Sequence, residues 1–380
     1  MMTELMNKNL LQLKPSGIRR FTALAKSVPD CAMLTIGEPD FSTPAPIKDA
    51  CKAALDADKT HYPPNTGEPA LRAAIAEFEA AQNELDYTAD EIIVTSGATE
   101  ALYTAITGML NPGDEVIIPT PAFGLYESIV TMAGAVCVFL DTAPDGFQIT
   151  PQALSAVMTA RTKLIILNSP NNPTGSVCTQ ESLQAVHDAV AGKPVFILCD
   201  DVYARLVYAP CPMFARYRDL RSQILVVQSF SKPYAMTGWR MGYLMGDEPV
   251  IRQLALLHAA AVVSVAAFSQ DACIQALKTD ITPMVETYRR RRDYIWDRIT
   301  AMGLPAVRPE GAFYIFPRIS QFGMSSEEFC TRLITEGKAA GVPGTCFGAE
   351  GYVRFSFCYE MPAIARGMDR LEAFLNRLQR

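Results

Sequence analysis

The stretch ILVVQSFSK, residues 224–232, decides how the middle of this chain folds. It starts with four apolar residues in succession and ends, after a short polar segment, in a lysine. An apolar run without alternation is typical of a strand that helices cover on both faces of a sheet. We therefore expect Lys232 to follow the carboxyl end of a buried strand.

Runs of the same kind recur between about residues 90 and 245, and segments with helical periodicity separate them. The other runs are residues 91–95, 115–119, 164–167 and 195–199. The helical segments include residues 99–109, 125–132 and 180–190. Alternating strands and helices predict an α/β domain with a mostly parallel sheet.

The two ends of the chain follow a different pattern, and a length of 380 residues suits about two domains. Near the C-terminus we expect helices at residues 283–302, 326–336 and 362–378 and strands at residues 311–316 and 352–357. The N-terminal stretch is rich in proline and glycine and cannot form a core alone. The chain is therefore predicted to consist of an N-terminal segment (1–45), a large domain (46–282) and a small α+β domain (283–380) on which the N-terminal segment packs.

The overall composition is that of a globular enzyme, with 49% hydrophobic and 19% charged residues. A net charge of −6 argues against a nucleic-acid partner, because such proteins are usually basic. The only dense basic run, residues 289–292, lies in a helical pattern. We interpret it as a solvated helix face.

Cysteine usage and hydropathy indicate the compartment. No two of the ten cysteines are three residues apart, so the chain lacks a C-x-x-C motif, and reduced thiols are favoured. The most apolar window, residues 254–268, is shorter than the roughly 20 residues that span a bilayer, and we interpret it as a buried helix. Residues 1–13 lack the apolar core of a signal peptide. These features predict a cytoplasmic protein with no membrane partner.

Residues with useful chemistry follow the predicted strands at one edge of the sheet, which is where open α/β sheets bind ligands. They offer the start of a helix, an aromatic ring, an amide, a carboxylate and an amine. In chain order these come from residues 96–100, 121–123, 168–175, 200–203 and 228–232, the last of which ends in Lys232.

This set of groups suits pyridoxal 5′-phosphate (PLP). A buried lysine can lose its proton and condense with an aldehyde. A carboxylate opposite a pyridine nitrogen keeps that ring protonated, so that it accepts electrons. The free N–H groups of a helix N-terminus bind phosphate, and an aromatic side chain can stack on the ring. The sequence therefore predicts a PLP enzyme, and we expect no metal ion in its site.

Several motifs together resemble the class I and II aminotransferases of the aspartate aminotransferase superfamily, over nearly the whole chain. They are GEPDF (37–41), YPPNTG (62–67), SGATEAL (96–102), NNPTG (171–175), SFSK (229–232), TGWRMG (237–242), GAFY (311–314) and VRFS (353–356). The resemblance implies the PLP-dependent transferase fold type I. In this fold a large domain with a mostly parallel, seven-stranded sheet between helices binds PLP, and both termini build a smaller α+β domain.

The resemblance also implies roles for the residues around the coenzyme ring. Lys232 would form the internal aldimine with PLP and later carry the proton between substrate and coenzyme. Asp200 would pair with the pyridinium nitrogen. Tyr203 and Asn172 would bind the ring hydroxylate, and Phe123 would cover one face of the ring.

Further roles concern the phosphate and the second subunit. Ser229, Arg240 and the backbone N–H groups of Ala98 and Thr99 would hold the phosphate. Tyr62 matches a residue that reaches the phosphate of the neighbouring subunit. The resemblance therefore implies a homodimer with shared active sites.

The implied reaction moves an amino group between an L-amino acid and a 2-oxo acid through pyridoxamine phosphate. Arg354 would bind the substrate α-carboxylate, Asn172 would line the same place, and Gly37 would let the backbone approach the substrate. A PLP-dependent carbon–sulfur β-lyase on the same fold is the alternative. The amino acid stays open: Arg19 or Arg20 would attract a dicarboxylate, but a solvated surface arginine is the favoured interpretation.

Two other enzyme classes fit the sequence poorly. Residues 229–232 also match the S-x-x-K motif of serine hydrolases, but the companion S-D-N and K-T-G motifs are absent. The chain contains no G-x-G, so it lacks the fingerprint of a nicotinamide dehydrogenase.

Overall fold

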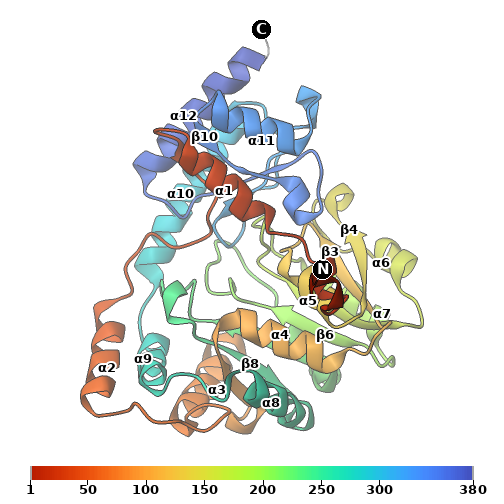
Figure 1. Cartoon of the computed structure of the whole chain (residues 1–380), viewed down its shortest axis with the longest axis vertical. Coiled ribbons are helices and arrows are strands. Elements are labelled where there is room, and N and C mark those ends of the chain that lie inside the picture. Colours follow the sequence, from red (N-terminus) through yellow and green to blue (C-terminus); the bar gives the residue numbers. More distant parts are fainter. Residues whose placement is uncertain (1, 379–380) are drawn as a thin grey trace.

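A seven-stranded sheet forms the centre of the molecule (Figure 1). The computed structural model describes residues 2–378. The strands are β2 (Ile92–Thr95), β3 (Glu115–Thr120), β4 (Val136–Asp141), β5 (Thr162–Asn168), β6 (Phe196–Asp200), β7 (Ile224–Ser229) and β8 (Gly242–Gly246), in the order β2-β8-β7-β6-β5-β3-β4. Only β8 runs antiparallel to its neighbours. The predicted α/β fold with a mostly parallel, seven-stranded sheet is confirmed.

Helices cover both faces of this sheet, which explains why its strands are apolar without alternation. In β7, Ile224 and Val226 face one apolar cluster, and Leu225 and Val227 face the other. The first cluster includes α2 (Ala45–Asp56), α3 (Pro69–Asn83), α6 (Pro151–Val157), α7 (Gln180–Val190) and α9 (Ala267–Leu277). The second includes α4 (Gly97–Met109), α5 (Leu125–Met132) and α8 (Glu248–Val262). The sheet edge between these layers stays accessible for a ligand.

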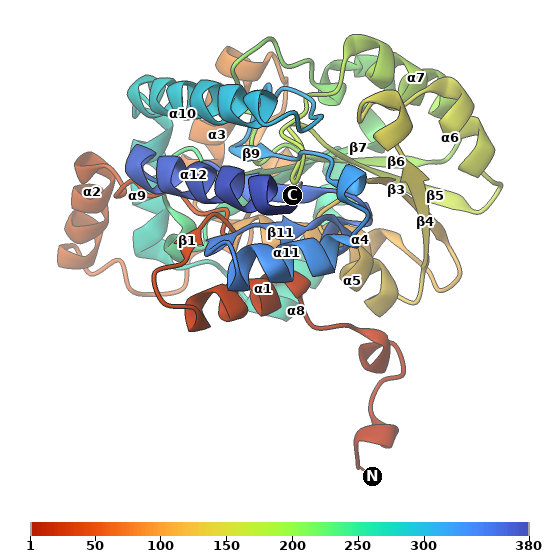
Figure 2. The same cartoon turned by 90° about the horizontal axis from the view of Figure 1, so that it is seen from above.

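A third apolar cluster joins the two ends of the chain (Figure 2). Strand β1 (Ala32–Met33) pairs in parallel with β10 (Ala339–Ala340). The other elements are α1 (Gly17–Ser27), α10 (Thr282–Ala301), α11 (Ser326–Thr335), α12 (Met361–Leu378) and the sheet of β11 (Val342–Pro343), β12 (Val353–Ser356) and β9 (Tyr314–Ile315). The pairing of β1 with β10 supports the proposed packing of the N-terminal segment, whereas the domain bounds stay a prediction.

The interpretation of residues 289–292 as a solvated helix face is wrong for two of the four arginines, since only Arg290 is exposed and Arg289 is partly exposed. Arg291 and Arg292 of α10 are buried. Both terminal nitrogens of Arg291 donate to the carboxylate of Asp40, at 2.8 and 2.7 Å. Arg292 Nη1 donates to the backbone oxygen of Pro309 at 2.9 Å. Each buried guanidinium thus has an acceptor, which is the condition under which burial of arginine is tolerated.

The interpretation of residues 254–268 as one buried helix is also wrong. Helix α8 ends at Val262, and α9 starts only at Ala267. Between them, Val263 takes the left-handed φ of 64°. Leu256 and Val263 are 66% and 50% exposed, although Leu254 is buried. Within residues 2–378, no helix is both long and apolar enough to cross a membrane.

Candidate active site

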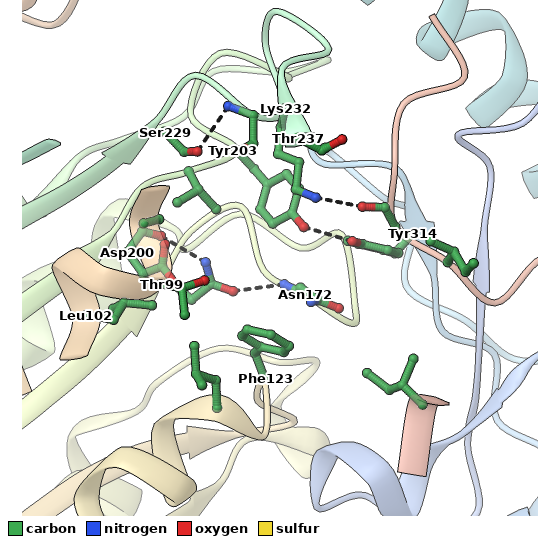
Figure 3. Close-up of a pocket in the computed structure, with 18 of the residues that line it drawn as sticks. Thr99, Leu102, Phe123, Asn172, Asp200, Tyr203, Ser229, Lys232, Thr237 and Tyr314 are labelled. Carbon is green, nitrogen blue, oxygen red and sulfur yellow. Dashed lines mark hydrogen bonds between the residues drawn. The ribbon is translucent and has the colours of Figure 1, made fainter. Parts of the chain in front are cut away.

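A cavity of about 590 Å³ opens at the carboxyl ends of the central strands (Figure 3). Every predicted site residue except Tyr62 lines it. The strand-end argument therefore brings together side chains from β5, β6, β7 and the start of α4. Tyr62 lies outside this cavity, and its side chain is 86% exposed.

Asp200 is the last residue of β6, and only one of its two carboxylate oxygens accepts a hydrogen bond within residues 2–378. It is 3% exposed, and burial raises its pKa to about 6. Tyr126 of α5 donates its hydroxyl proton to Oδ2, and Asn168 Nδ2 donates to the backbone oxygen of Asp200 at 2.8 Å. Oδ1 has no hydrogen-bond partner in the described part of the chain. A buried acceptor of this kind suits an N–H group of a ligand in the cavity.

Lys232 lies across the cavity from Asp200, in the loop that follows β7 (Figure 3). Its Nζ donates to the backbone oxygen of Gly37 at 2.6 Å. Burial lowers the pKa of this amine to about 8, because the charged form loses its hydration. A lysine with such a pKa is neutral often enough at neutral pH to attack an aldehyde.

The N-terminus of α4 forms an anion site at one end of the cavity. The cap residue, Ser96, makes no side-chain hydrogen bond to the first turn, so the N–H groups of Ala98 and Thr99 are free for an anion. Arg240 lies against this turn, and a Cβ added to Gly97 would come within 2.7 Å of its Nη2. Gly97 also has a φ of 74°, which glycine adopts without strain.

Ser229 closes the same end of the cavity. Its Oγ accepts from the N–H of Ser231 at 3.0 Å and remains on the cavity lining. Arg240 Nη1 donates to the backbone oxygen of Thr237 at 3.0 Å, which fixes the guanidinium beside the helix. The two side chains and the α4 N–H groups together can hold a phosphate.

A hydrogen-bonded group of polar side chains lines the opposite wall. The hydroxyls of Tyr203 and Tyr314 are 2.7 Å apart. The backbone N–H of Asn172 donates to Asn168 Oδ1 at 2.9 Å. The side-chain oxygen of Asn172 accepts a hydrogen bond from Arg354 Nη1 at 2.8 Å. Burial raises the pKa of Tyr203 well above its usual range, so its hydroxyl keeps its proton and can donate it to an anionic oxygen.

Arg354 of β12 is almost completely buried. Its Nη2 donates to the backbone oxygen of Thr35 at 2.5 Å, and its guanidinium lies 4.6 Å from the ring of Tyr314 and 4.9 Å from the ring of Phe347. Its Nε has no partner among residues 2–378. An arginine held so firmly can bind a carboxylate with little loss of entropy. Nearby, a Cβ on Gly37 would collide with the Tyr314 hydroxyl, so packing against Tyr314 already requires glycine at this position of the cavity lining.

Some lining residues were not predicted from the sequence. They are Tyr126 and Asn168, which support Asp200, Tyr314, which pairs with Tyr203, and Thr22, Ala23 and Lys26 of α1. Tyr314 belongs to the quoted GAFY motif, so a signal for it existed without an assigned role. Phe123 lines the cavity as predicted and packs edge-on against Tyr126.

The residues present fit PLP. The unused Asp200 oxygen suits a pyridinium N–H, the uncapped start of α4 suits a phosphate, and the amine of Lys232 suits an aldehyde.

Comparison with known proteins decides the family. The model of the family "Aminotransferase class I and II" matches residues 29–371. The chain belongs to this family. It is therefore a PLP-dependent aminotransferase.

Relatives and solved structures agree with this aminotransferase over its whole length. The protein of Bacillus subtilis named "Probable N-acetyl-LL-diaminopimelate aminotransferase" is 39% identical, over 98% of this chain and 96% of its own. An aspartate aminotransferase of Pyrococcus abyssi is 38% identical, over 97% and 98%. The solved aspartate aminotransferase from Thermus thermophilus with maleate superposes with a TM-score of 0.92 at 36% identity, over 97% and 99%. None of these relatives supports the β-lyase alternative.

Proposed function

We propose that the aminotransferase holds PLP between Lys232 and Asp200 and transfers the amino group of an L-amino acid to a 2-oxo acid. The observation that carries this assignment is the buried, unused Asp200 Oδ1 on the same cavity as an amine whose pKa lies near 8. When bound, PLP supplies an aldehyde that receives the amino group and a ring that withdraws electrons from the substrate Cα.

The chain's own residues then have separate tasks. Asp200 would keep a proton on the ring nitrogen, and Lys232 Nζ would take the proton from the substrate Cα and carry it to the coenzyme. Arg354 orients the substrate through its α-carboxylate. Arg240, with the start of α4, holds the phosphate and so fixes the coenzyme in the cavity.

Chemical trapping tests the assignment of Lys232. Reduction of the holoenzyme with borohydride, followed by peptide mapping, is expected to locate the coenzyme on Lys232. Addition of an amino acid should convert the coenzyme to its pyridoxamine form, and a 2-oxo acid should restore it. Label on another side chain overturns the assignment. Release of ammonia and pyruvate from a cysteine conjugate without that conversion favours the β-lyase.

A homodimer with shared active sites is part of the proposal. Tyr62 is exposed and does not line the cavity of its own subunit. We therefore expect it to contact the active site of a second copy. The first residues extend away from the body of the molecule (Figure 2). Large apolar side chains are exposed on this arm, namely Met2, Leu5, Met6, Leu10 and Leu11. Exposed apolar residues in such number favour a protein partner.

Mixing two defective variants tests this dimer. Lys232→Ala removes the amine, and Tyr62→Ala weakens the phosphate contact that a partner would receive. In mixed dimers one site carries both defects and the other carries none, so activity should return on mixing. Mixtures that stay inactive, or a fully active monomer at high dilution, contradict the proposal. A cytoplasmic location is proposed as well, because all ten cysteines are free thiols.

A further inference from the structure

Helix α8 contains a fully buried histidine, His258, that the proposed reaction does not use. Its ring lies between two acceptors. Nε2 is 2.9 Å from the backbone oxygen of Asn65, and Nδ1 is 3.1 Å from Oε1 of Glu100. A carbonyl oxygen can only accept, so Nε2 carries a proton. A second proton, on Nδ1 or on Glu100, then joins the ring to the carboxylate, and the ring bridges a loop and a helix.

One end of this bridge is the helix whose start forms the phosphate site. Glu100 lies in the first turn of α4, and its Oε2 accepts from the backbone N–H of Ser96 at 3.0 Å. Its Oε1 also accepts from the hydroxyl of Thr104 at 2.6 Å. The carboxylate thus holds the turn in which Ala98 and Thr99 line the cavity.

The other end of the bridge is the loop that carries Tyr62. Asn65 follows Tyr62 by three residues, and the two residues between them are Pro63 and Pro64. Proline fixes φ at about −65°, so this short segment is stiff. The direction in which Tyr62 points therefore depends on where Asn65 is held.

His258 is the side chain that holds the middle of this loop. Among residues 2–378, no other side chain forms a hydrogen bond to the backbone of residues 62–66. The N–H of Val94 donates to the backbone oxygen of Thr66 at 2.9 Å, but this bond lies beyond Asn65. Loss of the His258 ring would therefore release the segment next to Tyr62.

We propose that His258 and Glu100 are positioning residues that couple the two active sites of the dimer. They tie the helix that binds the phosphate of one subunit to the loop that presents Tyr62 to the phosphate of the other. The inference rests on the proposed homodimer with shared sites. Tyr62 is 86% exposed, so its direction depends on the loop rather than on packing of its own ring. A loop that is held in advance loses less entropy when Tyr62 binds, which strengthens the contact.

Mixed dimers measure this effect across the interface. One subunit carries Lys232→Ala, so only the other, wild-type subunit binds PLP covalently and gives the absorbance of the lysine-bound coenzyme. Adding His258→Gln to the Lys232→Ala subunit changes the loop that serves the wild-type site and leaves the wild-type chain itself unaltered. The wild-type subunit should then bind PLP about two- to tenfold more weakly, the range that one hydrogen bond contributes. An unchanged affinity overturns the inference.

The matched control is His187→Gln in the Lys232→Ala subunit. The ring of His187 also has a carboxylate at each nitrogen, Asp188 at 3.0 Å and Asp219 at 2.7 Å, but it joins α7 to residues 218–223 instead of to the loop. This control should leave the affinity of the wild-type subunit unchanged. Equal losses from the two histidine variants contradict a specific role of His258.

A combination with Tyr62→Phe shows whether His258 acts through Tyr62. In the Lys232→Ala subunit, Tyr62→Phe alone should weaken PLP binding by the wild-type subunit, because a phosphate contact is lost. His258→Gln should add nothing to that loss. A merely structural loosening would add to the effect of Tyr62→Phe, so additive losses overturn the inference.

The same contact can be removed from its other end by Glu100→Ala. This variant should weaken PLP binding by the wild-type subunit in the same range, and it takes the place of His258→Gln if that variant does not fold. Denaturant unfolding and size-exclusion chromatography verify that folded dimers are compared.

Failure of the proposed function would look different. If Tyr62→Phe leaves the affinity of the wild-type subunit unchanged, the shared site is absent and the inference falls with it. If Tyr62→Phe weakens binding but His258→Gln and Glu100→Ala do not, the shared site stands and only the inference is overturned.

Discussion

The deep end of the cavity and its opening are built on opposite principles. At the deep end, the side chains of Asp200, Tyr203 and Arg354 are buried, and they form hydrogen bonds with Tyr126, Tyr314 and Asn172, respectively. At the opening, Arg19 and Lys26 of α1 are exposed, and neither side chain forms a hydrogen bond or an ion pair within residues 2–378. The deep end is thus a preorganised sheet edge, whereas a solvated surface helix borders the opening.

This difference has a physical basis. A buried polar group without a partner costs free energy, so the deep end tolerates few changes. An exposed cation costs little when unpaired, because water solvates it. Helix α1 is attached mainly through the buried Phe21 and Ala25 and through the ion pair of Arg20 with Glu327. Substitutions on the cavity face of α1 should therefore leave the deep end undisturbed.

The largest effect is expected at the deep end, from Asp200→Asn. The amide cannot keep the ring nitrogen protonated, so kcat should fall about 10²- to 10³-fold, as when other preorganised electrostatic partners are lost. Asp201→Asn is the matched control. Asp201 follows Asp200 in the sequence and is also buried, but it lies outside the cavity lining, and burial raises its pKa well above its usual range. Steady-state kinetics with saturating PLP measure both variants, and equal losses would contradict the role of Asp200.

A smaller loss is expected from Arg354→Lys, which keeps the charge but not the planar fork. Lysine cannot reach Asn172 and Thr35 at once or stack against Tyr314 in the same way. We expect kcat/KM for the donor to fall about 10- to 100-fold. Spectroscopic titration should show unchanged affinity for PLP. A loss of PLP affinity of the same size would place Arg354 in the coenzyme site instead.

The deep end was also the part that sequence could predict. Lys232 and Asp200 follow apolar runs that form β7 and β6, and parallel strands bring their carboxyl ends to one edge. Helices α5 and α7 have the predicted bounds, because their periodicity is uninterrupted. Strand β8 was not predicted: it is short, begins and ends in glycine, and joins the sheet antiparallel. Its placement depends on its neighbours β2 and β7 rather than on its own pattern.

The rest of the site depends on tertiary contacts that no local pattern encodes. Tyr126 follows Phe123 by three residues, yet only the packing of α5 brings its hydroxyl to Asp200. Arg291 lies in a basic run, and its partner Asp40 is 251 residues away in the sequence. For the same reason, the sequence could name Arg19 or Arg20 as a candidate but could not choose between these two adjacent arginines. The fold alone turns one towards the cavity and the other towards Glu327.

A dependence on pH tests the deep end without a mutation. Burial lowers the pKa of Lys232 from 10.5 to about 8, and only the neutral amine reacts with an aldehyde. The rate at which the apoenzyme captures PLP covalently should therefore rise about tenfold per pH unit below pH 8 and level off above it. Stopped-flow absorbance measures this rate, and Lys232→Ala should lack the phase altogether. A rate that still rises steeply at pH 10 would mean that the amine is solvated.

The smallest effect is expected at the opening, from Arg20→Gln. The Arg20 and Glu327 side chains are 61% and 49% exposed, and such pairs contribute ~0–1 kcal/mol to the free energy of unfolding. Denaturant unfolding should show a loss within this range. Arg19→Gln removes the same charge from the same helix but breaks no ion pair within residues 2–378, so it should leave the free energy of unfolding nearly unchanged. If Arg20→Gln lowers the free energy of unfolding by much more than Arg19→Gln, beyond this range, the pair with Glu327 carries more of the attachment of α1 than its exposure indicates.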